Sequence, residues 1–102
     1  MLTSKQRAFL RSMANSLDPI LHVGKGELSD ALYKQADDAL AARELLKGKV
    51  LEACPLTSRE AAERIAQAVG AEVVQVIGRT FVLYRPNPKE PKIQLPREAR
   101  RG

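Results

Sequence analysis

The sequence predicts an α/β fold in which helices pack on a four-stranded mixed sheet. Three segments carry apolar residues at helical spacing, and each begins at a residue that can cap a helix. Short apolar or β-branched runs lie between and after these segments. The last two runs are separated by only two residues, which is typical of a hairpin. The predicted order is α-β-α-β-α-β-β.

The first predicted helix covers residues 4–15. Thr3 and Gln6 have the spacing of a capping box, in which each side chain accepts a hydrogen bond from the other residue's amide. Asp18-Pro19 ends the helix, because the residue before a proline is driven out of the α region. The predicted buried face consists of Phe9, Leu10, Met13 and Leu17.

A short strand, a glycine loop and a second helix come next. Residues 19–23 (PILHV) are apolar and suit a buried strand. The loop is Gly24-Lys25-Gly26-Glu27, and Ser29 is placed to cap the helix that follows it. The helical stripe consists of Leu32, Ala36, Ala39 and Leu40.

The second strand is predicted over residues 44–53, with a bulge at Gly48. Thr57 and Glu60 form the capping box of the third helix, and Gly70 ends it. The predicted buried face of this helix consists of Ala62, Ile65, Ala66 and Val69.

Residues 72–77 and 80–85 are the last two strands, joined by Gly78-Arg79 in a turn of type II′. Helical connections favour parallel neighbours among the first three strands, while the hairpin is antiparallel, so the sheet should be mixed. After residue 86 the composition changes to prolines and charges. We therefore expect one domain over residues 1–86 and an extended basic tail over 87–102, on which Ile93 and Leu95 are candidates to dock.

The net charge of +5 is concentrated near the ends of the sequence. Residues 79–102 hold seven basic and two acidic side chains, whereas residues 1–78 hold ten of each. Lys5, Arg7 and Arg11 make a second basic zone with no acidic residue before Asp18. Basic ends around an acidic middle suggest a polyanionic partner. The alternative is an ordinary solvated charged surface.

Several functional classes lack support in the sequence. No apolar run is long enough to span a bilayer, and the first residues lack the apolar core of a secretory signal. Single Cys54 cannot form an internal disulfide, so we expect a cytoplasmic protein. No zinc pattern, activated nucleophile or nucleotide-binding phosphate loop occurs, which predicts a protein that is not an enzyme and has no cofactor.

The glycine loop is the strongest local sign of function. Where a strand passes through glycines into a helix, backbone N–H groups and the positive helix end can meet a phosphate without an intervening Cβ. Lys25 adds a positive charge and Ser29 a hydroxyl group. The alternative is that these glycines only make a turn.

The stretches LTSKQ, VGKG, ARELLK and QVIGRTFVLYRP, in this order, resemble the YhbY family, the stand-alone bacterial form of the CRM domain (chloroplast RNA splicing and ribosome maturation). The resemblance covers nearly the whole chain. It implies a fold like the C-terminal domain of translation initiation factor three. It also implies RNA binding and association with precursors of the large ribosomal subunit.

The family's G-x-x-G loop corresponds to Gly24, Lys25, Gly26 and Glu27, so this sequence has a glutamate where the last glycine is expected. Gly78 and Arg79 match the family's hairpin glycine and the basic position after it. A carboxylate at Glu27 would repel phosphate, while the three preceding residues keep most of the loop's character.

We expect a monomer that binds RNA, with no membrane and no small-molecule substrate. With only four aromatic residues, recognition should depend on phosphates and RNA shape. A protein-binding adaptor that uses the helices and the basic tail is the main alternative, and an RNA-modifying enzyme is a remote one. The candidate contacts, in addition to Gly24, Gly26, Ser29 and Gly78, are Lys5, Arg7, Arg11, Lys25, Arg79 and Arg85.

Overall fold

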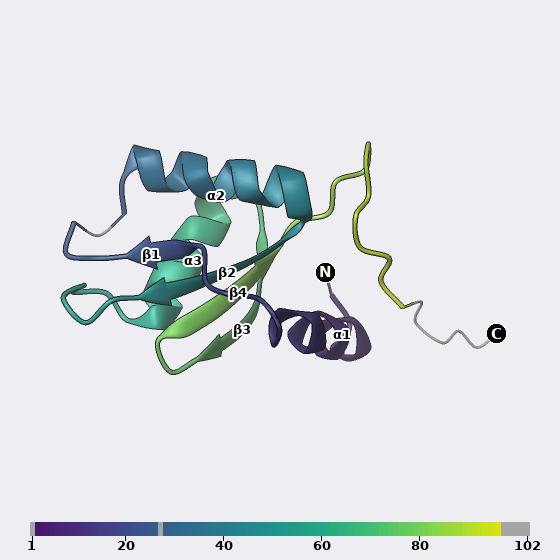
Figure 1. Ribbon diagram of the computed structural model, residues 1–102, viewed down its shortest axis with the longest axis horizontal. Coiled ribbons are helices and arrows are strands. Elements are labelled where there is room, and N and C mark those ends of the chain that lie inside the picture. Colours follow the sequence, from purple (N-terminus) through teal and green to yellow (C-terminus); the bar gives the residue numbers. More distant parts are fainter. Residues whose placement is uncertain (1, 27, 97–102) are drawn as a thin grey trace.

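Three helices and four strands alternate in the predicted order (Figure 1). The computed structural model describes residues 2–26 and 28–96. Each element lies within a few residues of its predicted range. The elements are α1 (Ser4–Ala14), β1 (Leu21–Val23), α2 (Asp30–Arg43), β2 (Leu45–Val50), α3 (Ser58–Val69), β3 (Glu72–Ile77) and β4 (Thr80–Tyr84).

The four strands form one mixed sheet in the order β1-β2-β4-β3. β1 pairs with β2 in parallel, as predicted for strands joined through a helix. The expectation that β3 would be a parallel neighbour of β2 is wrong, because β4 folds back from β3 and pairs antiparallel with both. The hairpin thus inserts its second strand into the centre of the sheet.

Each face of the sheet has its own apolar cluster. α2 and α3 cover one face, where Leu40, Ile65 and Phe81 are fully or almost fully buried. α1 covers part of the other face, where Leu10 packs near Val82 and Tyr84. Side chains on β2 and β4 alternate between the two clusters, as the pleat of a strand requires.

The capping signals in the sequence are confirmed. Thr3 and Thr57 both form complete capping boxes, and the Ser29 hydroxyl accepts a hydrogen bond from the Leu32 amide. Gly70 closes α3 in the left-handed region at φ 72°. Gly78 has φ 55° and Arg79 has no positive φ, as in a type II′ turn.

Two sequence predictions about packing are wrong. Phe9 and Met13 are 38% and 37% exposed, because α1 turns Ala14 toward the sheet together with Leu10, which is buried as predicted. Gly48 is not a bulge, since it pairs in register with Leu21 and Phe81. The irregularity lies in β3, between Val73 and Gln75.

Residues 87–96 lie at the end of the molecule that also holds α1 and the C-terminal end of α2 (Figure 1). The expected docking of Ile93 and Leu95 is confirmed, since both are half-buried against the apolar cluster that contains Leu10, which we call the α1 cluster. Glu44, 1% exposed, accepts hydrogen bonds from the amides of Asn87, Lys92 and Ile93. The division of the chain at residue 86 stays a prediction.

Candidate nucleic-acid interface

Three loops meet at one end of the sheet, on the left in Figure 1. The first loop follows β1, the second follows β2, and the third joins β3 to β4. The Leu51 amide donates to the Val23 carbonyl at 2.8 Å, and the Val50 amide donates to the Arg79 carbonyl at 2.7 Å. These bonds hold the glycine loop, the start of the β2–α3 connection and the hairpin side by side. We call this region the loop end.

The glycine loop presents its backbone to solvent. Lys25 and Gly26 are exposed, and a Cβ placed on Gly26 would meet nothing within 4 Å. Gly24 lies closer to the body, where a Cβ would be 3.5 Å from Leu51 Cδ1. Apart from its chain neighbours, Gly26 therefore leaves its backbone open to an anion. Glu27, the departure from the family loop, lies outside the described residues.

Ser29 is near the loop but its hydroxyl has a structural partner. It caps α2 by accepting from the Leu32 amide at 3.2 Å. The hydroxyl hydrogen remains able to donate to an anion, because capping uses only an oxygen lone pair. Ser29 therefore fits a supporting position at the loop end.

Arg79 is exposed at the tip of the hairpin. The Ser58 hydroxyl donates to the Gly78 carbonyl at 2.6 Å, which ties the hairpin to the start of α3. Two shallow grooves flank Arg79, one lined also by Arg59 and the other by Lys49. Arg79 thus shares one groove with Arg59 and the other with Lys49 and Glu52, on a turn that Ser58 holds to α3.

The candidate residues on α1 differ in their surroundings. Lys5 and Arg11 are exposed. Arg7 is partly buried, and its guanidinium donates to the Val73 carbonyl at 2.6 Å and lies 4.0 Å from the Glu72 carboxylate. Arg7 thus fastens α1 to β3, whereas Lys5 and Arg11 present their charges outward.

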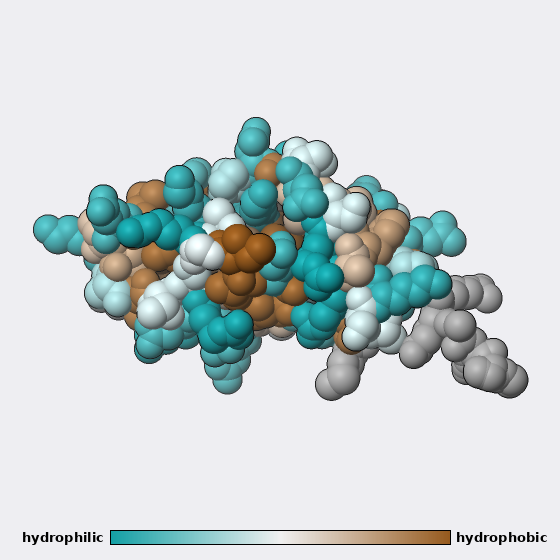
Figure 2. All heavy atoms as spheres, turned by 90° about the horizontal axis from the view of Figure 1, so that it is seen from below, coloured by the Kyte–Doolittle hydropathy of each residue, from teal (hydrophilic) through white to brown (hydrophobic). Residues whose placement is uncertain are grey.

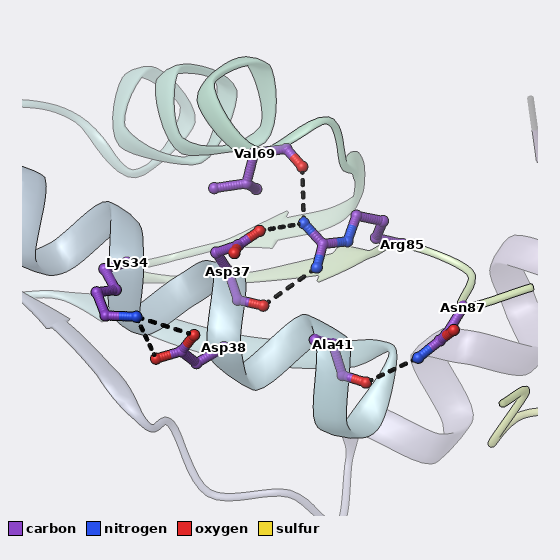
Figure 3. Close-up of polar contacts among 7 residues, drawn as sticks. All are labelled: Lys34, Asp37, Asp38, Ala41, Val69, Arg85 and Asn87. Atoms are coloured by element: carbon purple, nitrogen blue, oxygen red, sulfur yellow. Dashed lines mark hydrogen bonds and ion pairs between the residues drawn. The ribbon is translucent and has the colours of Figure 1, made fainter. Parts of the chain in front are cut away.

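Arg85 lies at the opposite end of the sheet from the loop end. Its guanidinium donates to the Asp37 carboxylate at 2.6 Å, to the Val69 carbonyl at 2.9 Å and to the Asp37 carbonyl at 3.1 Å (Figure 3). The side chain is 23% exposed and links α2 to α3. The structure does not bring Arg85 together with Lys25 and Arg79, so its predicted RNA contact stays a separate prediction.

Sequence reasoning missed two lysines on β2. Lys47 and Lys49 alternate with the buried residues Leu46, Gly48 and Val50, so both point to the face that carries α1. Lys49 is exposed, and Lys47 is partly covered where its ammonium donates to the Ala14 carbonyl at 3.3 Å. The alternation of Lys47 and Lys49 with apolar residues could have indicated one basic face of the strand. It was overlooked because the middle of the sequence was treated as a single acidic stretch.

Figure 2 views the side on which α1 and the hairpin lie in Figure 1. Hydrophilic side chains cover most of this side, with a group of hydrophobic ones near its middle. Among residues 2–26 and 28–96, no helix is long and apolar enough to cross a membrane. The same residues contain no group of three or more His, Cys, Asp or Glu side chains placed to hold a metal.

Comparison with known families matches residues 2–85 to the CRS1/YhbY (CRM) domain. The chain belongs to this family. The match begins just before α1 and ends just after β4, so it contains the whole sheet and all three helices. The resemblance found in the sequence is thereby confirmed.

Relatives of this CRM protein extend over almost its whole length. It is 45% identical to the Bacillus subtilis protein named "Probable RNA-binding protein YqeI", over 94% of this chain and 100% of the relative. It is 38% identical to a Haemophilus influenzae protein named "RNA-binding protein", over 95% of this chain and 97% of the relative. The solution structure of SAV1595 from Staphylococcus aureus superposes with a TM-score of 0.76 at 43% identity, covering 94% and 100% of the two chains. These matches support the α/β fold independently of the periodicity in the sequence.

Proposed function

We infer that this CRM protein binds RNA through the loop end, as an accessory factor rather than an enzyme. The observation that carries the inference is that exposed Lys25 and Gly26 follow a strand end tied, through the Leu51 and Val50 amides, to the hairpin that carries exposed Arg79. Exposed amides and mobile cations on adjoining loops suit a phosphate backbone. The relatives named as RNA-binding proteins support RNA binding, though not a particular site.

The RNA that fits the family resemblance is ribosomal RNA in precursors of the large subunit, in the cytoplasm. The described groups of the loop end, backbone N–H groups and cations, suit the RNA backbone and RNA shape rather than one base sequence. The alternative function, a protein-binding adaptor, would place the same cations on an acidic protein surface. Pull-down after nuclease treatment separates the two, because an adaptor keeps its partner when RNA is destroyed.

Salt dependence tests the proposed binding directly. If four to six phosphates are neutralised, a plot of log K against log salt should have a slope of roughly −3 to −5. Lys25→Gln and Arg79→Gln should each weaken binding and make the slope shallower by about 0.7 to 0.9. Fluorescence anisotropy with labelled RNA over a salt series measures both quantities.

Arg43→Gln is the matched control. Arg43 is exposed in the last turn of α2, at the opposite end of this helix from its cap Ser29 and the loop end. Its loss changes the net charge as the other two substitutions do, but it should leave the slope unchanged. A slope near zero for the unmodified protein, or equal losses in all three variants, would refute binding at the loop end.

A further inference from the structure

One row of residues crosses all four strands beyond the reach of α1. The strand register pairs His22 with Lys49, Lys49 with Thr80, and Thr80 with Ile77. We call these four residues the open row. Each strand contributes one member, so the row runs across the full width of the sheet.

The open row faces the α1 side of the sheet. The side chains next to His22, those of Leu21 and Val23, lie in the α2–α3 cluster. On β2, Val50 lies in the same cluster, and a Cβ on Gly48 would meet Phe81 there. Because side chains alternate along a strand, His22 and Lys49 point the other way. Phe81 and Val76 fix the direction of Thr80 and Ile77 by the same reasoning.

α1 stops one row short of these residues. The next row along the sheet contains Lys47, Val82 and Gln75. The ammonium of Lys47 donates to the carbonyl of Ala14, the last residue of α1. His22 and Lys49 are exposed, and Ile77 is 60% exposed. The helix therefore leaves the open row accessible.

The open row combines one lysine with an exposed aliphatic side chain. Ile77 is the most exposed large hydrophobic residue in the described part of the chain. The Thr80 hydroxyl donates to the Ile77 carbonyl at 2.9 Å, which holds the edge of the row in place. Lys49 and Arg79 line one groove together with the exposed Glu52, so the row is continuous with the loop end. The row itself contains no acidic residue.

We propose that the open row binds an unpaired segment of the RNA, with phosphates at Lys49 and Arg79 and a base lying on Ile77. The proposal rests on the function proposed above and specifies the form of RNA that this surface takes. Base faces are apolar and are accessible only where bases are unstacked, as in single-stranded loops and ends. A duplex presents phosphates and hydroxyls instead, for which an aliphatic side chain offers no partner.

The test compares a single-stranded RNA oligonucleotide with the same sequence annealed to its complement. The unmodified protein should bind the single strand more tightly. Ile77→Thr should weaken single-strand binding about three- to tenfold, because it removes apolar contact area while keeping a β-branched residue in the strand. Its salt slope should not change, since no phosphate contact is lost. Lys49→Gln should instead make the slope shallower by about 0.7.

Two further variants keep the experiment decisive. Ile77→Tyr offers a larger flat face and should tighten single-strand binding. Phe9→Ala removes a hydrophobic side chain of α1 outside the row and should leave binding unchanged. Thermal unfolding of every variant shows whether it is folded.

The outcomes separate this proposal from the function on which it rests. If the unmodified protein binds single-stranded RNA with a clear salt slope, but neither Ile77 variant changes the affinity, the open row is not a base platform and RNA binding stands. Equal losses from Phe9→Ala and Ile77→Thr, or tighter binding of the duplex, also overturn the proposal. If neither RNA binds at any salt concentration, the proposed function fails together with it.

Discussion

Gly48 shows how one residue decides the packing of the central strands. It lies opposite Phe81 in the register of β2 and β4, on the face covered by α2 and α3. A Cβ at Gly48 would lie within 3.0 Å of three atoms of the Phe81 ring. The ring therefore occupies the space that a side chain on β2 would need. Glycine serves here for close approach, and no unusual backbone conformation is involved.

Gly48→Ala should destabilise the protein by about 1–3 kcal/mol, because Phe81 must shift within a closely packed core. Urea unfolding followed by circular dichroism measures the free energy of unfolding. Gly26→Ala is the matched control, since a Cβ there meets nothing within 4 Å. A loss of stability in the control as large as in Gly48→Ala would contradict this account.

Single residues were predictable from sequence where their role is local. Thr3, Ser29 and Thr57 cap helices through partners three residues away, and all three caps are as predicted. Phe9 was misplaced because several faces of a short helix satisfy helical spacing, and only the sheet decides which face is buried. Phe81 is separated from Gly48 in the sequence by α3 and β3, but it lies opposite Gly48 in the sheet. The role of Gly48 therefore could not be predicted from the sequence.

At the scale of elements, Glu44 joins the end of α2 to the C-terminal segment. It is the C-cap of α2 in the left-handed conformation, with φ 67°. Its carbonyl accepts from the Arg85 amide, and its carboxylate accepts from three amides of residues 87–93. Burial disfavours the charged carboxylate, but the amides of Asn87, Ile93 and Lys92 outweigh it and hold the pKa of Glu44 below its ordinary value of 4.5. Glu44 therefore functions as an anion bound by the segment that follows β4.

This pKa shift makes stability depend on acidity. A carboxyl whose pKa is lower in the folded protein contributes stability above the unfolded pKa, and the contribution is lost as the pH falls through the folded pKa. We expect stability to fall as the pH is lowered below about 4.5, with part of the loss due to Glu44. Glu44→Gln should cost about 1–3 kcal/mol at neutral pH, since its amide nitrogen cannot accept these hydrogen bonds, and should flatten the acid part of the profile.

Glu63→Gln is the control for this prediction. Its exposed carboxylate lies 3.6 Å from Arg59 on the surface of α3. Such a pair contributes little, so stability should stay within about 0.5 kcal/mol. If Glu44→Gln is as mild as this control, the hydrogen bonds to the C-terminal segment do not stabilise the fold.

The elements themselves could be predicted, but their arrangement could be predicted only in part. Periodicity and caps place α1, α2 and α3, because both signals are short-range. The position of β4 between β2 and β3 depends on pairing across more than thirty residues, for which the sequence pattern gives no signal. For the same reason Lys49 and Arg79 could not be placed together from the sequence, although each lies on a correctly predicted element.

At the scale of the whole molecule, the two ends of the sheet differ in their contacts. The loop end exposes Lys25 and Arg79 on short connections. The opposite end is held by Glu44, by Arg85 and by the packing of Ile93 and Leu95 against the α1 cluster. If RNA binds at the loop end as proposed, it does not need to disturb the contacts that hold the opposite end.

Two truncations separate the structural and the electrostatic contributions of the C-terminal segment. Residues 87–96 make contacts with the domain, such as the Gln6 side-chain amide donating to the Pro96 carbonyl at 3.3 Å. Residues 97–102 contain no large apolar side chain. Removal of residues 97–102 deletes Arg97, Arg100 and Arg101, and should weaken RNA binding and its salt slope while stability stays within about 0.5 kcal/mol.

Removal of residues 87–102 should also lower stability, because Glu44 loses its three amide donors and the α1 cluster loses Ile93 and Leu95. Unfolding should remain cooperative, since the buried residues of both clusters lie before residue 87. Calorimetry and anisotropy on the same two proteins measure stability and binding. Equal stability of the two truncations would show that residues 87–96 do not support the fold. Unchanged RNA affinity in both would confine binding to the loop end and the open row.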